Sequence, residues 1–222
     1  MNAQHIKSDF NPTNIVTSDF VISTKQKIKM EQNELYPIFL KLHNLNVLIV
    51  GGGNVGLEKL SFLLKSSPNA NVEVVAKDFH LEIKVLAEKH PSIKLTESKF
   101  KKGMLKKRHM VIACTDDLEV NKKVYDLARK RYLICNIADT PDLCDYYLGG
   151  IVTKGNVKIA ISTNGKSPTT AKRLREFFEE VIPEDINAMV ENLNEYRKTL
   201  KGDFEDKVKR MNEITASLKN KE

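Results

Sequence analysis

The chain has 222 residues, of which 41% are hydrophobic, enough to bury the core of one large or two small domains. Its 36 Lys and Arg residues against 29 Asp and Glu residues give a net charge of +7, which suits nucleic acid, a membrane surface or a polyanionic small molecule. The basic residues are spread along the chain without an interleaved aromatic stripe, so nucleic acid is a minority interpretation. No apolar stretch approaches the ~20 residues of a membrane span, and the N-terminus lacks the apolar core of a signal peptide, so we expect a cytoplasmic protein.

The cysteines argue for an intracellular protein without a disulfide framework. Cys114, Cys135 and Cys144 are odd in number and show no Cys-x-x-Cys spacing. Cys114 and Cys135 lie in apolar runs, and we interpret them as core residues rather than nucleophiles. No cluster of His, Cys and Asp has metal-ligand spacing, so the sequence predicts no resident metal site.

The N-terminal part of the chain is polar and gives few structural signals. We expect residues 1–34 to form an extension that is flexible or packs only at the periphery, with residues 14–17 and 20–23 as candidate short strands. Residues 36–42 then lead into the first strand at 47–50, whose β-branched and apolar residues predict burial on both faces.

A glycine-rich turn follows this strand at once. Three glycines with the spacing Gly-x-Gly-x-x-Gly stand between the strand and a helix pattern, which is the order of the dinucleotide-binding fingerprint. The first glycine allows the sharp turn, the second lets backbone amides approach a pyrophosphate, and the third lets the helix lie close on the strand. The helix N-terminus then faces the phosphates; the alternative is a tight βα turn without a ligand. The expected cofactor contacts are Gly51, Gly53, Asn54, Val55 and Gly56.

The end of the second strand leaves NAD against NADP open. Residues 71–76 predict this strand, and an acid about 20 positions on from the glycines often binds the ribose hydroxyls of NAD. Here Lys77, which suits a 2′-phosphate, follows the strand, and Asp78 is the first acid. A helix at 81–90 and a short strand at 93–96 come next.

A further buried strand, predicted at 109–114, ends in the polar sequence Thr115-Asp116-Asp117. Ligands of a doubly wound sheet lie beyond the carboxyl ends of its strands, so we expect the backbone around Thr115 and Asp116 to border the cofactor. The alternative is that Thr or Asp is the N-cap of a helix at 118–131, and both roles can hold together.

Asp139 is the candidate catalytic residue. It lies just past a strand predicted at 132–136, on the same rim as the glycine turn. Asp-Thr-Pro is also good turn chemistry, so the residues alone leave a turn-forming role open.

The strand–helix alternation then gives way to antiparallel pairing. Residues 151–162 predict a hairpin, and a polar loop follows, which is a candidate anion site. Ser167 as N-cap and Pro168 as first residue predict the next helix. Residues 182–222 predict amphipathic helices broken at Gly202, whose apolar stripes are typical of a core or of a partner seam.

These elements predict an α/β fold in which a NAD-binding Rossmann domain is followed by a small α+β segment and a helical C-terminal domain. The predicted boundaries are 1–34 for the extension, 35–147 for the Rossmann domain, 148–181 for the hairpin and helix, and 182–222 for the helical domain.

Taken together, the motifs resemble the precorrin-2 dehydrogenase / sirohydrochlorin ferrochelatase family, the N-terminal module of siroheme synthase. They follow the family's order and spacing over roughly residues 35–180. The matching pieces are Tyr36-Pro-Ile-Phe-Leu40, Val50-Gly-Gly-Gly-Asn-Val-Gly56, Ile112-Ala-Cys-Thr-Asp-Asp117 with Asn121, Asn136-Ile-Ala-Asp139 and Ile159-Ala-Ile-Ser-Thr-Asn-Gly-Lys-Ser-Pro168.

The resemblance implies NAD-dependent oxidation of precorrin-2 to sirohydrochlorin and, for many members, insertion of Fe²⁺ to give siroheme. It implies that Asp139 matters for both steps, since one carboxylate over the ring plane can accept protons in each. It also implies a homodimer in which the 148–181 segment is exchanged, and a substrate rich in carboxylates, which fits the basic chain. The residues it places at the tetrapyrrole are Asn136, Ser162, Thr163, Lys166 and Ser167.

Two residues depart from the family pattern, and two other functions stay open. Gly149 stands where the family often has proline, and Asn164 where glycine is common. The first alternative is a dehydrogenase without chelatase activity. The second is a non-catalytic NAD(H)-sensing dimeric module, which accounts for the glycine turn but not for the Asp139 and Ser167 segments. We expect neither nucleic acid nor a membrane as partner.

Overall fold

The structure is a computed structural model that describes residues 32–216. The candidate strands at 14–17 and 20–23 lie outside the described residues. All elements below belong to one unit of the chain, Leu35–Glu222.

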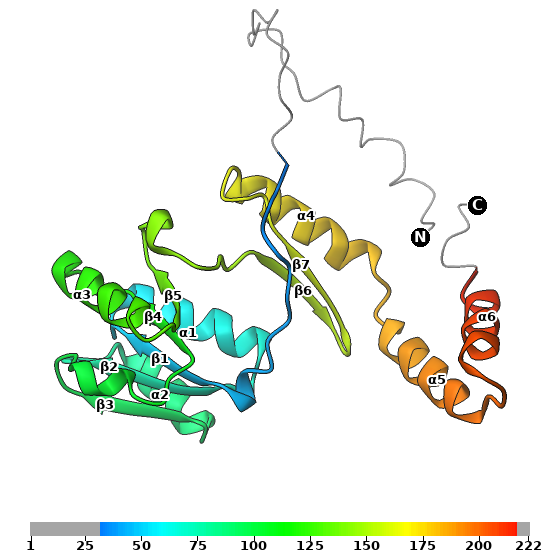
Figure 1. The fold of residues 1–222 in the computed structure, drawn as a ribbon, viewed down its shortest axis with the longest axis horizontal. Coiled ribbons are helices and arrows are strands. Elements are labelled where there is room, and N and C mark those ends of the chain that lie inside the picture. The colour runs from blue at the N-terminus through cyan, green and yellow to red at the C-terminus, as the bar shows by residue number, and fades with distance from the viewer. Residues whose placement is uncertain (1–31, 217–222) are drawn as a thin grey trace, which may run out of the picture. The chain divides into compact units, whose positions relative to one another are not determined.

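Five parallel strands form the sheet on which the chain is built (Figure 1). Their order is β3-β2-β1-β4-β5, so the chain starts at the centre, builds out to one edge and then crosses to the other. This is the order of a Rossmann-type sheet, and it confirms the predicted α/β class. The strands are β1 Asn46–Val50, β2 Asn71–Ala76, β3 Ile93–Glu97, β4 Met110–Ala113 and β5 Ile134–Ile137.

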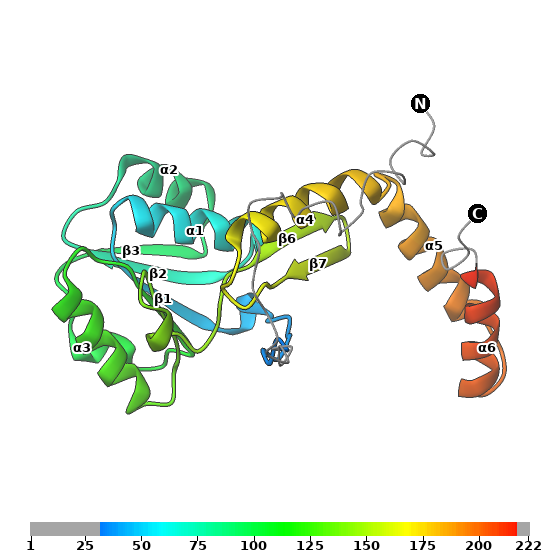
Figure 2. The ribbon, with the colours of Figure 1, turned by 90° about the horizontal axis from the view of Figure 1, so that it is seen from above.

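Both faces of the sheet are covered, as the continuous apolar run of β1 predicts. Val47 and Ile49 pack into the core layer beneath α1 and α2, whereas Leu48 and Val50 pack into the layer beneath α3. Figure 2 shows α1 and α2 on one face of the sheet and α3 on the other. These helices are α1 Asn54–Ser66, α2 Leu81–Lys89 and α3 Leu118–Arg129.

The strand β5 begins at Ile134, two residues later than the sequence predicts. Tyr132 has a φ of 57° and its side chain is 97% exposed, because it ends α3 rather than opening the strand. Its N–H donates to Arg129 O, and the N–H of Leu133 donates to Ala128 O, which is the paired bonding of a Schellman helix end. Glycine is usual at this left-handed position. Because tyrosine occupies it here, the sequence does not indicate that the helix ends at this residue.

A partly buried ion pair joins β2 to the segment before β4. The Glu73 carboxylate accepts hydrogen bonds from Thr96 and Arg108, and Lys94 lies 3.5 Å away. Burial pushes the pKa of Glu73 upward, but these donors and the two cations together hold that pKa below its ordinary value of 4.5. The folded state therefore favours the ionised carboxylate.

Glu73→Gln is expected to lower the free energy of unfolding at neutral pH by about 2 kcal/mol, because Arg108 loses a charged partner. Since the pKa of Glu73 is lower in the folded chain, its contribution is fully present above pH 4.5 and is lost as pH falls through the folded-state pKa. Urea unfolding of both proteins from pH 7 to pH 3 should show the difference shrinking in acid. Lys94→Gln is the control, since Lys94 is exposed and its pair is worth less than about 1 kcal/mol; a pH-independent difference for Glu73→Gln would contradict the assignment.

The hairpin and the helix that follows have the predicted form. β6 Gly150–Lys154 pairs antiparallel with β7 Val157–Ile161. α4 Pro168–Val181 begins where predicted, with Ser167 Oγ accepting the N–H of Thr170 at 3.2 Å. The Lys158 ammonium on β7 donates to Ser66 O at the end of α1, which ties the hairpin to the Rossmann part.

The last helices, α5 Ile186–Thr199 and α6 Phe204–Ile214, contain no buried residue. Their apolar stripes are therefore at least partly exposed in the described chain. The segment before β1 is similarly open, with Tyr36 86% and Phe39 68% exposed. Within residues 32–216, no helix combines the length and apolar character that crossing a membrane requires.

Candidate functional site

The carboxyl ends of β1, β4 and β5 lie side by side along one rim of the sheet. The strand pairing continues past the strands, because the N–H of Cys114 donates to Val50 O at 2.8 Å and the N–H of Ala138 donates to Ala113 O at 2.9 Å. Adjacent strands are about 5 Å apart. Three loops therefore begin side by side at the same edge of the sheet: the glycine turn after β1, the loop after β4 and the Asp139 loop after β5.

The glycine turn has the steric form that the fingerprint predicts. Gly51 has a φ of 132°, and a Cβ on it would lie 2.5 Å from Cys114 O. A Cβ on Gly56 would lie 2.3 Å from Gly51 O, so helix and turn approach to backbone contact. A Cβ on Gly53 would meet no atom within 4 Å, which leaves open space where a pyrophosphate is expected to approach.

The N-terminus of α1 is free of side-chain caps. Its N-cap is Gly53, no side chain of residues 32–216 caps the first turn, and that turn contains no acidic residue. Asn54 is exposed and Val55 is half-buried at this end. The uncapped N–H groups and the helix dipole together suit an anion such as a phosphate, so this end fits a dinucleotide.

Gly52 contributes to the turn although the sequence analysis gave it no role. A Cβ on it would lie 2.3 Å from Asp78 O, and Gly52 O accepts the N–H of His80 at 2.7 Å. The glycine turn therefore lies against the loop after β2. Lys77 and Asp78 are exposed in that loop, which places both candidate ribose contacts beside the turn.

The loop after β4 is held by a buried asparagine. Thr115 donates through its N–H and its hydroxyl to Asn121 Oδ1, at 3.1 and 2.8 Å, and Asn121 Nδ2 donates to Thr115 O at 2.8 Å. Asp117 accepts the N–H groups of Glu119 and Val120, which confirms the predicted N-cap. Asp116 is exposed, and contact of this loop with a cofactor stays a prediction.

Asp139 lies in the turn that follows β5. Its φ is 59°, a left-handed conformation that aspartate and asparagine adopt more readily than other residues with a Cβ. The N–H of Thr140 donates to Ile137 O at 3.3 Å, which closes the turn. The side chain is exposed. Within residues 32–216 its carboxylate makes no hydrogen bond or ion pair, so it is available to a ligand at the rim.

The segment that follows this turn, which contains Asp145 and Tyr146, is hydrogen-bonded to β5. Asn136 is 7% exposed, and its Nδ2 donates to Tyr146 O at 2.9 Å. The Asp145 carboxylate accepts the N–H of Cys135 at 2.9 Å and Arg129 Nη1 at 2.7 Å. Asn136, predicted to contact a substrate, thus has a structural partner in the described chain.

Tyr146 is packed against the core layer that includes Leu60 and Cys114. Its hydroxyl is buried and has no hydrogen-bond partner within the described residues. Burial raises the pKa of the phenol far above its ordinary value, so the hydroxyl stays neutral. A buried hydroxyl without a partner destabilises the folded state.

Tyr146→Phe is therefore expected to raise the free energy of unfolding by about 1 kcal/mol, because the desolvated hydroxyl is removed and the ring packing is kept. Chemical unfolding of the two proteins measures this. Tyr125→Phe on α3, a half-buried tyrosine in the other core layer, serves as the comparison and should change stability less. A loss of stability in Tyr146→Phe would show that its hydroxyl has a partner.

The loop between β7 and α4 is ordered by its own side chains. Thr163 Oγ1 donates to Ser167 O at 3.1 Å and accepts the N–H of Ser167 at 3.3 Å. Ser162 Oγ accepts the N–H of Asn164 at 3.1 Å, and Lys166 donates its N–H to Thr163 O at 3.0 Å. The loop therefore has the fixed form of a candidate anion site, and substrate contact by its residues stays a prediction.

Both departures from the family pattern have a structural explanation. Asn164 has a φ of 54°, which asparagine tolerates better than other residues with a Cβ, so it replaces glycine without large strain. A Cβ on Gly149 would lie 2.1 Å from Ile161 O. Any larger residue at 149 would displace the end of β7.

Two of the cysteines are buried and neutral. Burial raises the pKa of Cys114 and that of Cys135 to about 12, so both are neutral core thiols, as predicted. Among residues 32–216 no group of three or more His, Cys, Asp and Glu side chains is arranged to hold a metal ion.

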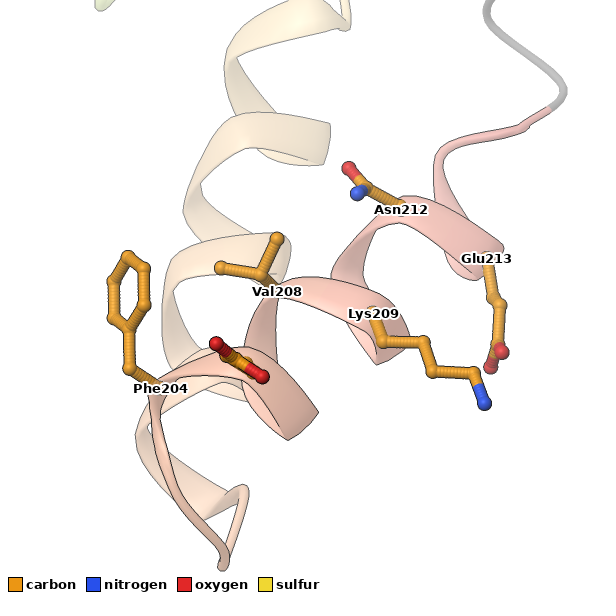
Figure 3. Close-up of a pocket in the computed structure, with 6 residues that line it drawn as sticks. Phe204, Val208, Lys209, Asn212 and Glu213 are labelled. Carbon is orange, nitrogen blue, oxygen red and sulfur yellow. The ribbon is translucent and has the colours of Figure 1, made fainter.

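A cavity of about 510 Å³ lies away from the predicted site residues, on α6 (Figure 3). Phe204 and Val208 form its apolar part, and Phe204 is 74% exposed. Lys209 and Glu213 extend outward from the same helix in Figure 3. None of the predicted site residues lines this hollow.

Comparison with known proteins extends over most of the chain. Residues 38–150 match a family profile described as "Putative NAD(P)-binding", and residues 154–180 match "Sirohaem biosynthesis protein central". The "Siroheme synthase" of Pseudoalteromonas translucida (strain TAC 125) is 38% identical over 173 residues, which are 78% of this chain and 34% of that protein. The "Siroheme synthase" of Actinobacillus pleuropneumoniae serotype 7 (strain AP76) is 34% identical over 168 residues, 76% of this chain and 34% of that protein.

The chain spans about a third of the length of these curated relatives. The solved structure of "SirC, precorrin-2 dehydrogenase" has a similar fold, with a TM-score of 0.66, 25% identity, and coverage of 81% of this chain and 89% of that one. The profiles, the relatives and the fold agree with the rim geometry: this chain belongs to the family of the siroheme synthase N-terminal module and precorrin-2 dehydrogenase.

Proposed function

We propose that the chain oxidises precorrin-2 to sirohydrochlorin with NAD⁺ and that Asp139 is the catalytic base. The observation that carries the proposal is the position of Asp139: an exposed carboxylate without a partner within residues 32–216, leaving the sheet rim two strands from the glycine turn. Two strand spacings are about 10 Å, a distance that a nicotinamide and a tetrapyrrole edge can span. The printed name of the similar solved structure, "SirC, precorrin-2 dehydrogenase", supports the same substrate.

The residues of the glycine turn are proposed to hold the cofactor. Gly53 leaves room for the pyrophosphate, and the N–H groups of Asn54, Val55 and Gly56 open the uncapped end of α1 toward it. Gly51 shapes the turn, and the Thr115–Asp116 backbone borders the opposite side. NAD⁺, when bound, supplies the hydride acceptor.

Dehydrogenation removes a hydride and a proton from precorrin-2, and the proton needs a base. Asp139 accepts it from the ring, and solvent regenerates the carboxylate, because the side chain is exposed. The remaining substrate contacts are proposed for Asn136 and for Ser162, Thr163, Lys166 and Ser167 of the loop before α4. Lys166 adds a cation for a substrate that carries many carboxylates.

Insertion of Fe²⁺ into sirohydrochlorin is a second proposed step, in which iron is a substrate. The pyrrole nitrogens must lose protons, and Asp139 is suited to accept them. A dehydrogenase without chelatase activity is the competing candidate. It is favoured by one observation, that residues 32–216 contain no cluster of metal-ligating side chains.

We also propose a homodimer in which the 148–181 segment lies at the interface. Apolar side chains are uncovered on α4 and α6: Val181 is 50% exposed, and Ile214 is 47% exposed. A second copy would bury such residues and remove their contact with water. Light scattering after gel filtration should give twice the chain mass, and a monomer at all concentrations would contradict the proposal.

The proposed activity is tested by incubating the protein with precorrin-2 and NAD⁺ and following the appearance of NADH. Fe²⁺ is then added to the product, and siroheme is measured against the uncatalysed rate. NADH formation without siroheme would favour the dehydrogenase alone. Binding of NAD⁺ without turnover would favour a NAD(H)-sensing module. Calorimetry with NAD⁺ and NADP⁺ separates the two cofactors, and tighter binding of NADP⁺ would assign Lys77 rather than Asp78 to the ribose.

A further inference from the structure

Within residues 32–216 the Asp139 carboxylate makes no hydrogen bond or ion pair, so its direction depends on its backbone. Asp139 has a left-handed conformation, which aspartate and asparagine adopt more readily than other residues with a Cβ, and such a conformation persists where the surroundings hold it. The question is therefore which contacts hold the turn from Ile137 to Thr140.

One side chain contacts both ends of this turn. Cys144 Sγ accepts the N–H of Ile137 at 3.3 Å and lies 3.2 Å from Ile137 O and 3.4 Å from Thr140 O, the two carbonyls to which the thiol can donate. Asn136 Nδ2 also approaches the sulfur, at 3.4 Å. The sulfur thus bridges the first and last residues of the turn that contains Asp139.

Cys144 is itself held against β5. The next residue, Asp145, donates its N–H to Cys135 O at 2.8 Å and accepts the N–H of Cys135 through its carboxylate. The N–H of Cys144 donates to Pro141 O at 3.0 Å. Burial raises the pKa of the Cys144 thiol, which keeps it a neutral donor.

We infer that Cys144 is a positioning residue for the proposed dehydrogenation: its thiol closes the Ile137–Thr140 turn and thereby aims the Asp139 carboxylate along the rim. The inference rests on the proposed function, in which Asp139 is the base. It adds a residue that touches neither substrate nor cofactor. A small displacement of a reacting group is enough to lower a rate by a large factor.

The test compares Cys144→Ala and Cys144→Ser with Cys135→Ala. Cys135 is a fully buried thiol in the core layer beneath α3. Its Sγ makes no hydrogen bond within residues 32–216, so its truncation removes packing without removing a side-chain bond to the turn. We expect Cys144→Ala to lower kcat for precorrin-2 oxidation about tenfold, with KM and the NAD⁺ Kd within twofold of wild type. Cys144→Ser, which keeps a donor and an acceptor, should restore most of kcat, and Cys135→Ala should keep it.

A second readout does not depend on turnover. Amide hydrogen exchange of the 137–144 segment should become faster in Cys144→Ala and stay at the wild-type rate in Cys135→Ala. An active wild type whose kcat is unchanged by Cys144→Ala would overturn the inference and leave the proposed function intact. If wild type does not oxidise precorrin-2, the proposed function fails, and unchanged exchange in Cys144→Ala would then overturn the positioning role separately.

Discussion

Asp139→Asn is expected to lower kcat for precorrin-2 oxidation by about 10²- to 10⁴-fold, because the amide cannot accept the proton. The NAD⁺ Kd should stay within twofold of the wild-type value, because Asp139 follows β5 and is not part of the glycine turn after β1. Asparagine tolerates the left-handed φ of 59° at this position, so the backbone should be preserved. Steady-state kinetics and calorimetry measure the two effects.

The matched control for this prediction is Asp142→Asn. Asp142 is an exposed acid in the short helix η5 Pro141–Leu143 of the same loop, and its substitution removes the same charge. It should keep kcat within about twofold. If iron insertion occurs, Asp139→Asn should lower it as well. Turnover like that of wild type in Asp139→Asn would remove Asp139 from the mechanism.

Gly53→Ala and Gly51→Ala are expected to separate cofactor binding from folding. Gly53 has φ −84° and ψ −161°, which alanine adopts, and a Cβ on it would meet no atom of residues 32–216 within 4 Å. The new methyl group should therefore leave the unfolding temperature unchanged but occupy the space of the pyrophosphate. We expect the NAD⁺ Kd to rise by at least about tenfold.

Gly51→Ala should instead lower the stability of the folded chain. Its φ of 132° disfavours a Cβ, and that Cβ would lie 2.5 Å from the Cys114 carbonyl oxygen, which is backbone and cannot move alone. We expect a loss of about 3 kcal/mol in the free energy of unfolding. Thermal unfolding and NAD⁺ titration of both variants give the comparison. Equal NAD⁺ affinity in Gly53→Ala and wild type would place the cofactor elsewhere.

The sequence predicts the sheet and its rim well, because the signals there are local. An apolar run such as Val47–Val50 indicates a strand covered on both faces, and Ser167-Pro168 indicates the start of a helix. The fingerprint places the glycine turn after the first strand, and the βα alternation places Asp139 at the end of β5. Each of these depends on neighbours in the sequence.

The contacts that fix the Asp139 loop have no such signal. Cys144 bonds back to Ile137, and Asp145 bonds back to Cys135, through single polar contacts that follow no period. The predicted start of β5 was two residues too early for a related reason. Tyr132 takes a helix-ending position at which the usual sequence signal is glycine. The apolar stripes of α5 and α6 predict helices, but not whether the same chain or a partner covers them.

A crystal structure of the protein with NAD⁺ and sirohydrochlorin tests the central claim most directly. The account predicts the pyrophosphate over Gly53 at the N-terminus of α1, and the Asp139 carboxylate within about 3 Å of a proton-bearing atom of the tetrapyrrole. A tetrapyrrole bound away from the rim of β1, β4 and β5, or an Asp139 side chain directed away from the ring, would contradict it.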